Sequence, residues 1–203
     1  MIRVNFKLLL AIMLGFVIGG VSAAGIRVSR QESLVTVPGL MVTGKAEIGG
    51  PFRLVDQAGH EFTEQQLPGK PSLIVFGHTR SDISSAALNV ISQAVESAGP
   101  KAKTVRIILI SLDWESDTPD VLKSYLQRYS PNIIGLSGNE EEIRHVASAF
   151  KVFLKRDTAS DGSVVINHSP LVLAFNARGA YVSLLRLPTN VAAVASLLAT
   201  LTE

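Results

Sequence analysis

Apolar runs alternate along the chain with segments whose apolar residues recur at helical spacing. The runs Ser72–Phe76 and Val105–Leu112 lack a polar face, which is typical of central strands covered by helices on both sides. A third, shorter run covers Ile133–Leu136. The helical positions that follow these runs are Ile83, Ala87, Leu88, Ile91 and Val95, then Val121, Leu122, Tyr125, Leu126 and Tyr129, then Ile143, Val146, Ala147 and Phe150. The pattern predicts consecutive strand–helix units in one layered α/β domain.

Each predicted helix begins at a residue that can cap free backbone N–H groups. Ser81 or Asp82 caps the first helix, Thr118 precedes Pro119 in the second, and Asn139 precedes the third. The acidic run 140–142 suits the positive end of a helix, so it indicates a helix start rather than a metal site.

Two hairpins complete the predicted domain. The first pairs Phe52–Asp56 with the region of Phe62, and the second pairs Leu171–Phe175 with Tyr181–Leu185. A closing helix follows, with apolar positions at Val191, Val194, Leu197, Leu198 and Leu201. Strand–helix units followed by a hairpin and a last helix predict a thioredoxin-like fold, with a mixed central sheet flanked by helices and an added N-terminal β-hairpin. By analogy with thioredoxin folds, Pro170 is expected to follow a cis Ser169–Pro170 bond.

The N-terminus has the pattern of an export signal. Arg3 and Lys7 precede a largely apolar stretch, Leu8–Val21, with small residues after it. Residues 1–24 are therefore expected to be a signal peptide or an N-terminal membrane anchor, residues 25–49 an extended tether, and residues 50–203 the folded domain.

Composition narrows the range of functions. The chain carries 19 Lys and Arg against 17 Asp and Glu, and without Arg3 and Lys7 the counts are 17 and 17, which disfavours a nucleic-acid partner. The chain contains no cysteine, so thiol exchange and thiolate-based copper(I) binding are excluded. No residues stand out as a binding site for a small-molecule substrate.

Several ordered segments resemble the SCO/SenC family of copper-handling, thioredoxin-fold proteins that assist cytochrome c oxidase assembly. The matching segments are Gly69-Lys70-Pro71, Phe76-Gly77 with Thr79, the stretch Ser111–Pro119, Ile133–Gly138 and Asn167-His168-Ser169. The resemblance covers nearly all of the chain from about Gly50 onward. It implies a protein without catalytic residues. Together with the N-terminal leader, it predicts a periplasmic protein that is either soluble there or tethered to the inner membrane. It also implies a protein partner in oxidase or copper-protein assembly.

The resemblance also shows what this chain has lost. In the family a Cys-Pro-x-x-x-Cys pair and a distant histidine hold copper. Those cysteines fall on Ser81 and Ser85, Asp82 replaces the proline, and His168 alone remains of the copper-binding trio. Hydroxyls do not replace thiolates as copper(I) ligands, so we expect a degenerate metal site in an accessory binding module.

Two other interpretations of these residues are open. His78 and Asp82 are candidates to join His168 in a nitrogen and oxygen site for copper(II) or zinc, which would make the chain a metal carrier. We favour instead a hydrogen bond from His168 to Ser81 or Ser85. A serine hydrolase centred on Ser81 is disfavoured because the Gly-x-Ser-x-Gly signature is missing.

Trp114 stands where the family has proline, and it suits either a partner interface or the cover of a local hydrophobic gap. Asp113 is expected to bond nearby backbone amides rather than to orient a catalytic base. His60, in the first hairpin turn, and His145, on the surface of the third helix, are weak site candidates.

Overall fold

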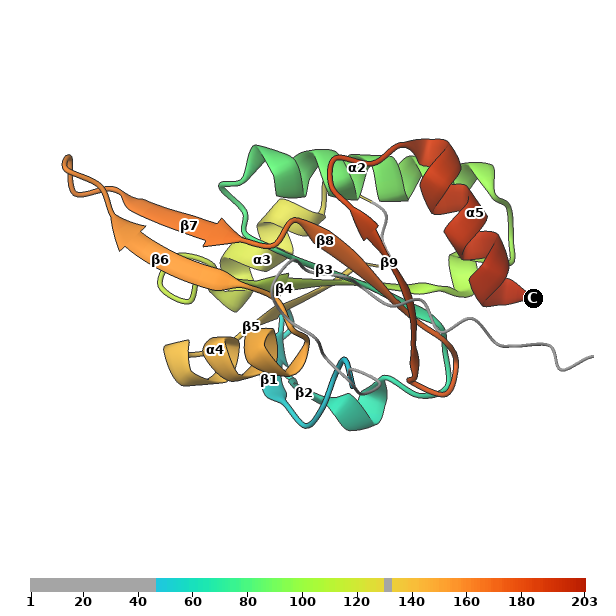
Figure 1. Cartoon of the computed structure of the whole chain (residues 1–203), viewed down its shortest axis with the longest axis horizontal. Coiled ribbons are helices and arrows are strands. Elements are labelled where there is room, and N and C mark those ends of the chain that lie inside the picture. The colour runs from blue at the N-terminus through green and yellow to red at the C-terminus, as the bar shows by residue number, and fades with distance from the viewer. Residues whose placement is uncertain (1–46, 130–132) are drawn as a thin grey trace, which may run out of the picture. The chain divides into compact units, whose positions relative to one another are not determined.

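The computed structural model describes residues 47–129 and 133–203 of the chain (Figure 1). The expectations for the leader at 1–24 and for most of the tether lie outside these residues and stay predictions. The boundary expected at Gly50 is likewise still a prediction. No helix within the described ranges is both long enough and apolar enough to cross a membrane.

A seven-stranded mixed sheet forms the centre of the domain, with strands in the order β2-β1-β5-β4-β3-β8-β9. The strands are β1 Arg53–Asp56, β2 Glu61–Thr63, β3 Ser72–Gly77, β4 Arg106–Ser111, β5 Ile133–Ser137, β8 Leu171–Phe175 and β9 Tyr181–Arg186. The three central strands β3, β4 and β5 run parallel, whereas β8, β9, β1 and β2 are added to them in antiparallel pairs. This arrangement confirms the thioredoxin-like fold and its N-terminal hairpin.

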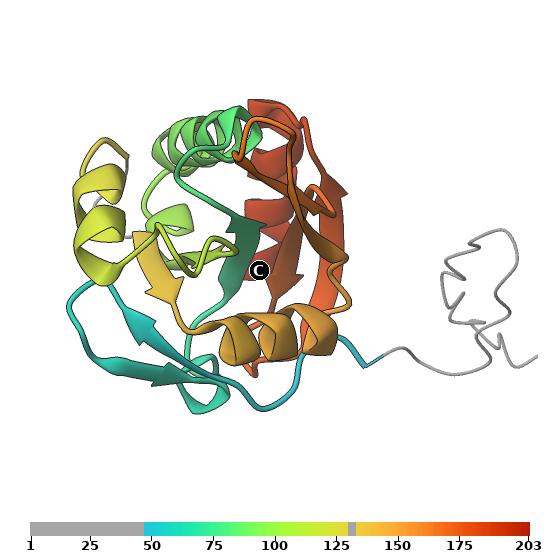
Figure 2. The ribbon, with the colours of Figure 1, turned by 90° about the vertical axis from the view of Figure 1, so that its left-hand side faces the viewer.

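Helices cover both faces of the sheet, as Figure 2 shows. They are α2 Asp82–Ser97, α3 Pro119–Leu126, α4 Glu140–Ala149 and α5 Val191–Thr202, with short 3-10 turns η1 Glu64–Gln66 and η2 Ala102–Thr104. The capping predictions are confirmed, because the side chains of Ser81, Thr118 and Asn139 accept backbone N–H bonds at the starts of α2, α3 and α4.

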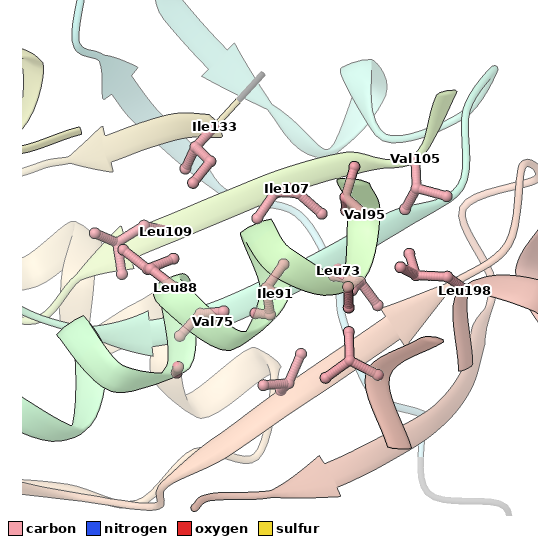
Figure 3. Packing of buried hydrophobic residues seen from close by; sticks show 14 of the residues in the cluster. Leu73, Val75, Leu88, Ile91, Val95, Val105, Ile107, Leu109, Ile133 and Leu198 are labelled. Atoms are coloured by element: carbon pink, nitrogen blue, oxygen red, sulfur yellow. The ribbon is translucent and has the colours of Figure 1, made fainter. Parts of the chain in front are cut away.

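Alternation along the buried strands divides the core into two clusters. Every residue of β3 is buried, as the unbroken apolar run predicts. Leu73 and Val75 pack under α2 and α5, whereas Ile74 and Phe76 face the α4 side. This is the period-2 geometry of a strand with a helical layer on each face. Figure 3 shows the first cluster, in which Leu88 and Ile91 of α2 lie over the sheet.

A second, two-stranded sheet projects from one end of the domain and was not predicted. It consists of β6 Leu154–Thr158 and β7 Val164–His168, joined by a turn at Asp161-Gly162. Figure 1 shows this hairpin extending away from the main sheet. Leu154 at the start of β6 pairs with His168 at the end of β7, so the base of the hairpin carries the candidate histidine.

The expectation of a cis Ser169–Pro170 bond is wrong. Among the described residues the cis peptide bond is Leu187–Pro188. The Ser169 amide donates to the carbonyl of Phe153 at 3.1 Å, and the Pro170 carbonyl accepts from Leu187 at 2.8 Å. The segment thus continues the extended path of the β8–β9 hairpin, which the ordinary trans bond permits.

Candidate functional site

The loop between β3 and α2 carries the positions that correspond to the family cysteines. Ser81 caps α2: its Oγ accepts from the Ser84 amide at 3.2 Å, and its amide donates to the His78 carbonyl at 3.1 Å. The Ser81 hydroxyl is therefore used in capping, the role predicted for it.

The close approach of β3 to α2 requires glycine at position 77. A Cβ at Gly77 would lie 2.1 Å from Oγ of Ser84, which is itself buried. That hydroxyl accepts the His78 amide at 3.2 Å. The missing side chain at Gly77 thus lets Ser84 tie the start of the loop to the first turn of α2.

Ser85, at the second cysteine position, forms its hydrogen bond with a residue outside the β3–α2 loop. Its hydroxyl forms a 3.0 Å hydrogen bond with the Tyr125 hydroxyl of α3. Burial raises the pKa of Tyr125 to about 12, so this phenol stays protonated. Ser85 and Tyr125 thus form a neutral link between two helices.

His78 and His168 lie next to each other although they are far apart in the sequence. Their ring centroids are 6.4 Å apart with an angle of 75° between the rings. Burial lowers the pKa of both imidazoles, and the charge that the His168 ring would carry lowers the pKa of His78 further. Asp117 and Asp113 act in the opposite direction on His78. The pair is therefore neutral at neutral pH and offers nitrogen lone pairs.

The expected hydrogen bond from His168 to Ser81 or Ser85 is wrong. Nδ1 of His168 instead bonds the carbonyl of Ser169 at 3.0 Å, because the ring lies against its own chain at the hairpin base. Nor does Asp82 complete a three-ligand site with the two histidines. It is exposed in the first turn of α2, and the described residues contain no group of three or more His, Asp or Glu side chains placed to hold a metal ion.

The buried carboxylate of Asp117 holds the start of the β3–α2 loop in place. Asp117 accepts hydrogen bonds from the Thr79 amide at 2.9 Å, from the Thr79 hydroxyl at 2.6 Å and from the Ser111 hydroxyl at 2.5 Å. Three bonds to one charged acceptor fix the backbone that immediately follows His78. Asp117 was not among the predicted site residues, although it lies in the stretch Ser111–Pro119 that matches the family pattern.

A second buried carboxylate, Asp113, joins the loop to the hairpin. Arg80 bonds its Oδ2 at 2.5 Å, and Arg156 of β6 lies 3.7 Å from its Oδ1. Burial would raise the pKa of Asp113, but the hydrogen bond and charge of Arg80, with further bonds from Ser116, outweigh it and lower the pKa. The prediction of bonds to nearby backbone amides did not anticipate the pairing of Asp113 with two arginines.

Trp114 lies beside this network and is flanked by two guanidinium groups. Arg156 lies 4.5 Å and Arg144 lies 5.1 Å from the centre of its ring, and Arg156 also pairs with Glu115. The indole packs against the α4-side core and is only partly exposed. These contacts fit the interpretation that Trp114 covers a hydrophobic gap, while a role at an interface stays a prediction.

The remaining histidines lie away from this site. His60 is exposed in the first hairpin turn and pairs with Asp56 at 3.4 Å. His145 is exposed on α4 and bonds the Pro51 carbonyl at 2.9 Å. Both positions agree with the predictions.

Comparison with known proteins agrees with this arrangement. The SCO1/SenC family model matches residues 41–203. A SCO2-like protein of Rickettsia felis is 38% identical over 138 residues, which cover 66% of this chain and 67% of the relative. The mitochondrial protein SCO2 of Saccharomyces cerevisiae is 33% identical over 146 residues, covering 70% of this chain and 48% of the yeast protein.

Solved structures of Sco proteins are also similar to this chain. ScoI of Bradyrhizobium japonicum with copper bound has a TM-score of 0.69 and 37% identity, covering 76% of this chain and 99% of that one. Yeast Sco1 with copper bound has a TM-score of 0.68 and 28% identity, covering 75% and 87%. BsSco, described as a member of the Sco family of cytochrome c oxidase assembly proteins, has a TM-score of 0.61 and 22% identity, covering 77% and 94%.

Proposed function

Because this chain belongs to the SCO1/SenC family, we propose that it is an accessory protein in the assembly of cytochrome c oxidase or of another copper protein. It acts as a non-catalytic binding module whose thiolate copper site has been lost. Two related structures contain copper, and a third protein of the same fold belongs to a family of oxidase assembly proteins. These relatives support the role in assembly and copper handling.

One observation carries the proposal: the fold is kept while the metal-binding sulfurs are replaced by hydroxyls with structural roles. Ser81 caps α2 and Ser85 bonds Tyr125. Neither hydroxyl ionises near neutral pH, so neither supplies the soft anionic ligand that copper(I) prefers. The residues present therefore do not fit the copper site of the family, and a docking role is the function that the remaining structure supports.

The N-terminal sequence supports export from the cytosol. The apolar segment of residues 8–21, preceded by Arg3 and Lys7, supports export to the periplasm, with the chain either free there or held at the inner membrane. The expected partner is a protein of the oxidase or of the copper-delivery system. The neutral charge balance outside the leader speaks against nucleic acid.

Deletion of the gene in its own host, followed by measurement of oxidase activity and copper content in membranes, tests the role in assembly. We expect both to fall and to return with the unchanged chain. They should also return with the Ser81→Ala/Ser85→Ala double variant, because the hydroxyls do not act on copper. Unchanged oxidase and copper-protein levels after deletion would refute the proposal, and failure of the Ala variant, if it is folded, would show that the hydroxyls have a functional role.

Restoring the sulfurs tests the loss of the copper site separately. The Ser81→Cys/Ser85→Cys variant returns both thiolates to the scaffold that still carries His168. We expect it to hold copper(I) at least a hundredfold more tightly than the unchanged chain in an anaerobic competition titration. Equal affinities would contradict the assignment of Ser81 and Ser85 as the former cysteine positions.

A further inference from the structure

Basic side chains gather at the end of the sheet opposite to the β3–α2 loop. At this end Ser72, the first residue of β3, pairs with Arg106 at the start of β4 and with Phe175 at the end of β8. The segments before β3 and between β8 and β9 also meet here, because the Gly69 amide donates to the Ala177 carbonyl at 2.8 Å. Figure 1 shows the β6–β7 hairpin projecting from the other end.

We call this surface the basic end. Its basic residues lie in or next to the segments that precede β3, β4 and β5, that follow α4, or that join β8 to β9, and all except Arg106 are exposed. They are Lys70, Lys101, Lys103, Arg106, Arg128, Lys151 and Arg178.

The cations of the basic end have no carboxylate partner. Within residues 47–129 and 133–203, none of them forms an ion pair. Around the β3–α2 loop and the hairpin, by contrast, four basic side chains are paired with carboxylates: Arg80, Arg144, Lys155 and Arg156. Unpaired charges of one sign produce a field that attracts a partner of the opposite sign, so the basic end favours an anionic partner.

Acidic residues gather at the loop end instead. Three helices begin there with acidic first turns, at Asp82, at Asp120 and at residues 140–142, because each of these helices follows one of the parallel strands. No basic side chain lies in the last turn of α2, α4 or α5, so favourable charge at helix C-termini does not account for the basic end. The acidic residues at the basic end are fewer than its basic residues; they are Glu47, Glu64, Glu96 and Glu203.

The predicted tether joins the domain at the basic end. The Gly49 amide donates at 3.0 Å to the carbonyl of Ala149, the last residue of α4, and a Cβ at Gly49 would lie 3.7 Å from the ring of Phe175. The apolar stretch Leu8–Val21 upstream is the predicted leader or membrane anchor. A chain of about 25 residues reaches up to about 80 Å when fully extended, so attachment alone does not fix the orientation of the domain.

We propose that the basic end binds the surface of a bilayer that contains anionic phospholipids. Each Lys or Arg that reaches such a surface strengthens binding by about fivefold. Binding through this end directs the β3–α2 loop and the β6–β7 hairpin away from the membrane, toward a partner in solution. This contact goes beyond the proposed docking function, which requires no lipid.

The orientation of the domain can be measured with one introduced thiol, because the chain contains no cysteine. The full-length chain is placed in vesicles of phosphatidylcholine and phosphatidylglycerol, with some lipids carrying a nitroxide on the headgroup. Ala98→Cys puts a fluorophore at the end of α2, at the basic end, and Ser160→Cys puts one near the tip of the hairpin; both positions are exposed. We expect quenching at position 98 to exceed that at position 160 by at least about twofold.

Charge reversal tests whether the cations cause this difference. Lys101→Glu/Lys103→Glu should abolish it. Lys155→Glu/Arg186→Glu is the matched control, since it makes the same change of net charge at exposed positions of the other end, and it should leave the difference unchanged. Vesicles of phosphatidylcholine alone should abolish the difference, as should about 1 M salt, at which the screening length falls to about 3 Å.

Three results would overturn the proposal. One is equal quenching at the two positions on anionic vesicles, which is expected if the basic end serves an acidic protein partner instead of lipid. The others are a difference that persists on neutral vesicles and one that persists in Lys101→Glu/Lys103→Glu. No partner protein is present in this assay, so its result is independent of the deletion experiment that tests the role in assembly.

Discussion

Substitution of Asp113 by Asn should destabilise the fold by about 3 kcal/mol. The side chain of Asp113 is fully buried, that of Arg156 is 11% exposed and that of Arg80 is 53% exposed. Removing one partner of a buried ion pair costs about 3–5 kcal/mol, because the other charge stays buried. Water compensates the exposed Arg80, and Glu115 still pairs with Arg156, so the loss falls at the lower end of that range.

Urea unfolding at pH 7 measures this loss as the difference in the free energy of unfolding. Glu96→Gln is the matched control, since it makes the same change of carboxylate to amide at an exposed position of α2 and should alter the free energy by less than about 0.5 kcal/mol. Arg80→Ala should cost a similar amount, because it removes the hydrogen bond to a fully buried carboxylate and leaves Arg156, 3.7 Å away, as the remaining cation beside Asp113. A cost below about 1 kcal/mol for Asp113→Asn would show that the buried carboxylate does not hold the loop and the hairpin together.

Asp113→Asn should also change how the stability of the fold depends on pH. The pKa of Asp113 lies below its ordinary value of 3.8 in the folded chain. Its contribution is therefore fully present above about pH 4 and is lost as the pH falls through the folded pKa. The difference between the unchanged chain and Asp113→Asn should be constant from pH 5 to pH 7 and should shrink below about pH 4. A difference that already disappears above pH 5 would contradict a lowered pKa.

Three further substitutions test the local geometry. Gly77→Ala should lower the free energy of unfolding in urea by about 1–3 kcal/mol, because its Cβ would overlap the Ser84 hydroxyl. Adding Ser84→Gly should recover part of that loss. A Gly77→Ala variant of full stability would refute the close approach. Ser81→Ala should cost about 1 kcal/mol of stability through loss of the α2 cap and lower Tm by a few degrees. Ser81→Asn should be nearly neutral, because asparagine also caps helices. Equal Tm values for the two variants would argue against capping. Lys151→Gly should raise the free energy of unfolding by about 0.5–1 kcal/mol, because Lys151 has φ of 58°, a left-handed conformation that glycine adopts without strain. A loss of stability on this change would contradict strain at Lys151.

Most of the fold could be predicted because its signals are local. The unbroken apolar run of β3 and the cap at Ser81 each depend on a few consecutive residues. The β6–β7 hairpin was missed because its apolar positions, such as Val164 and Ile166, alternate over one short strand outside the main sheet. The Asp161-Gly162 turn between two β-forming segments was the signal that could have revealed it.

The site was less predictable because its contacts join distant parts of the chain. The pairing of Asp113 with Arg156 depends on where the hairpin lies. The approach of His78 to His168 depends on it too, and the family resemblance rather than sequence spacing suggested it. Sequence spacing contains no information on that position. The same reason explains the wrong hydrogen-bond partner expected for His168, since its nearest acceptor turned out to be the carbonyl of the next residue.

The position of β3 in the sheet also determines when folding can be completed. One neighbour of β3 is β4, which follows it closely, but the other is β8, so that Ser72 pairs with Phe175. The ribosome releases β3 long before β8, and during that interval a largely apolar strand has one edge without hydrogen-bond partners. Such an edge can be extended by another chain, so nascent or truncated forms that end before β8 should aggregate unless a chaperone protects them.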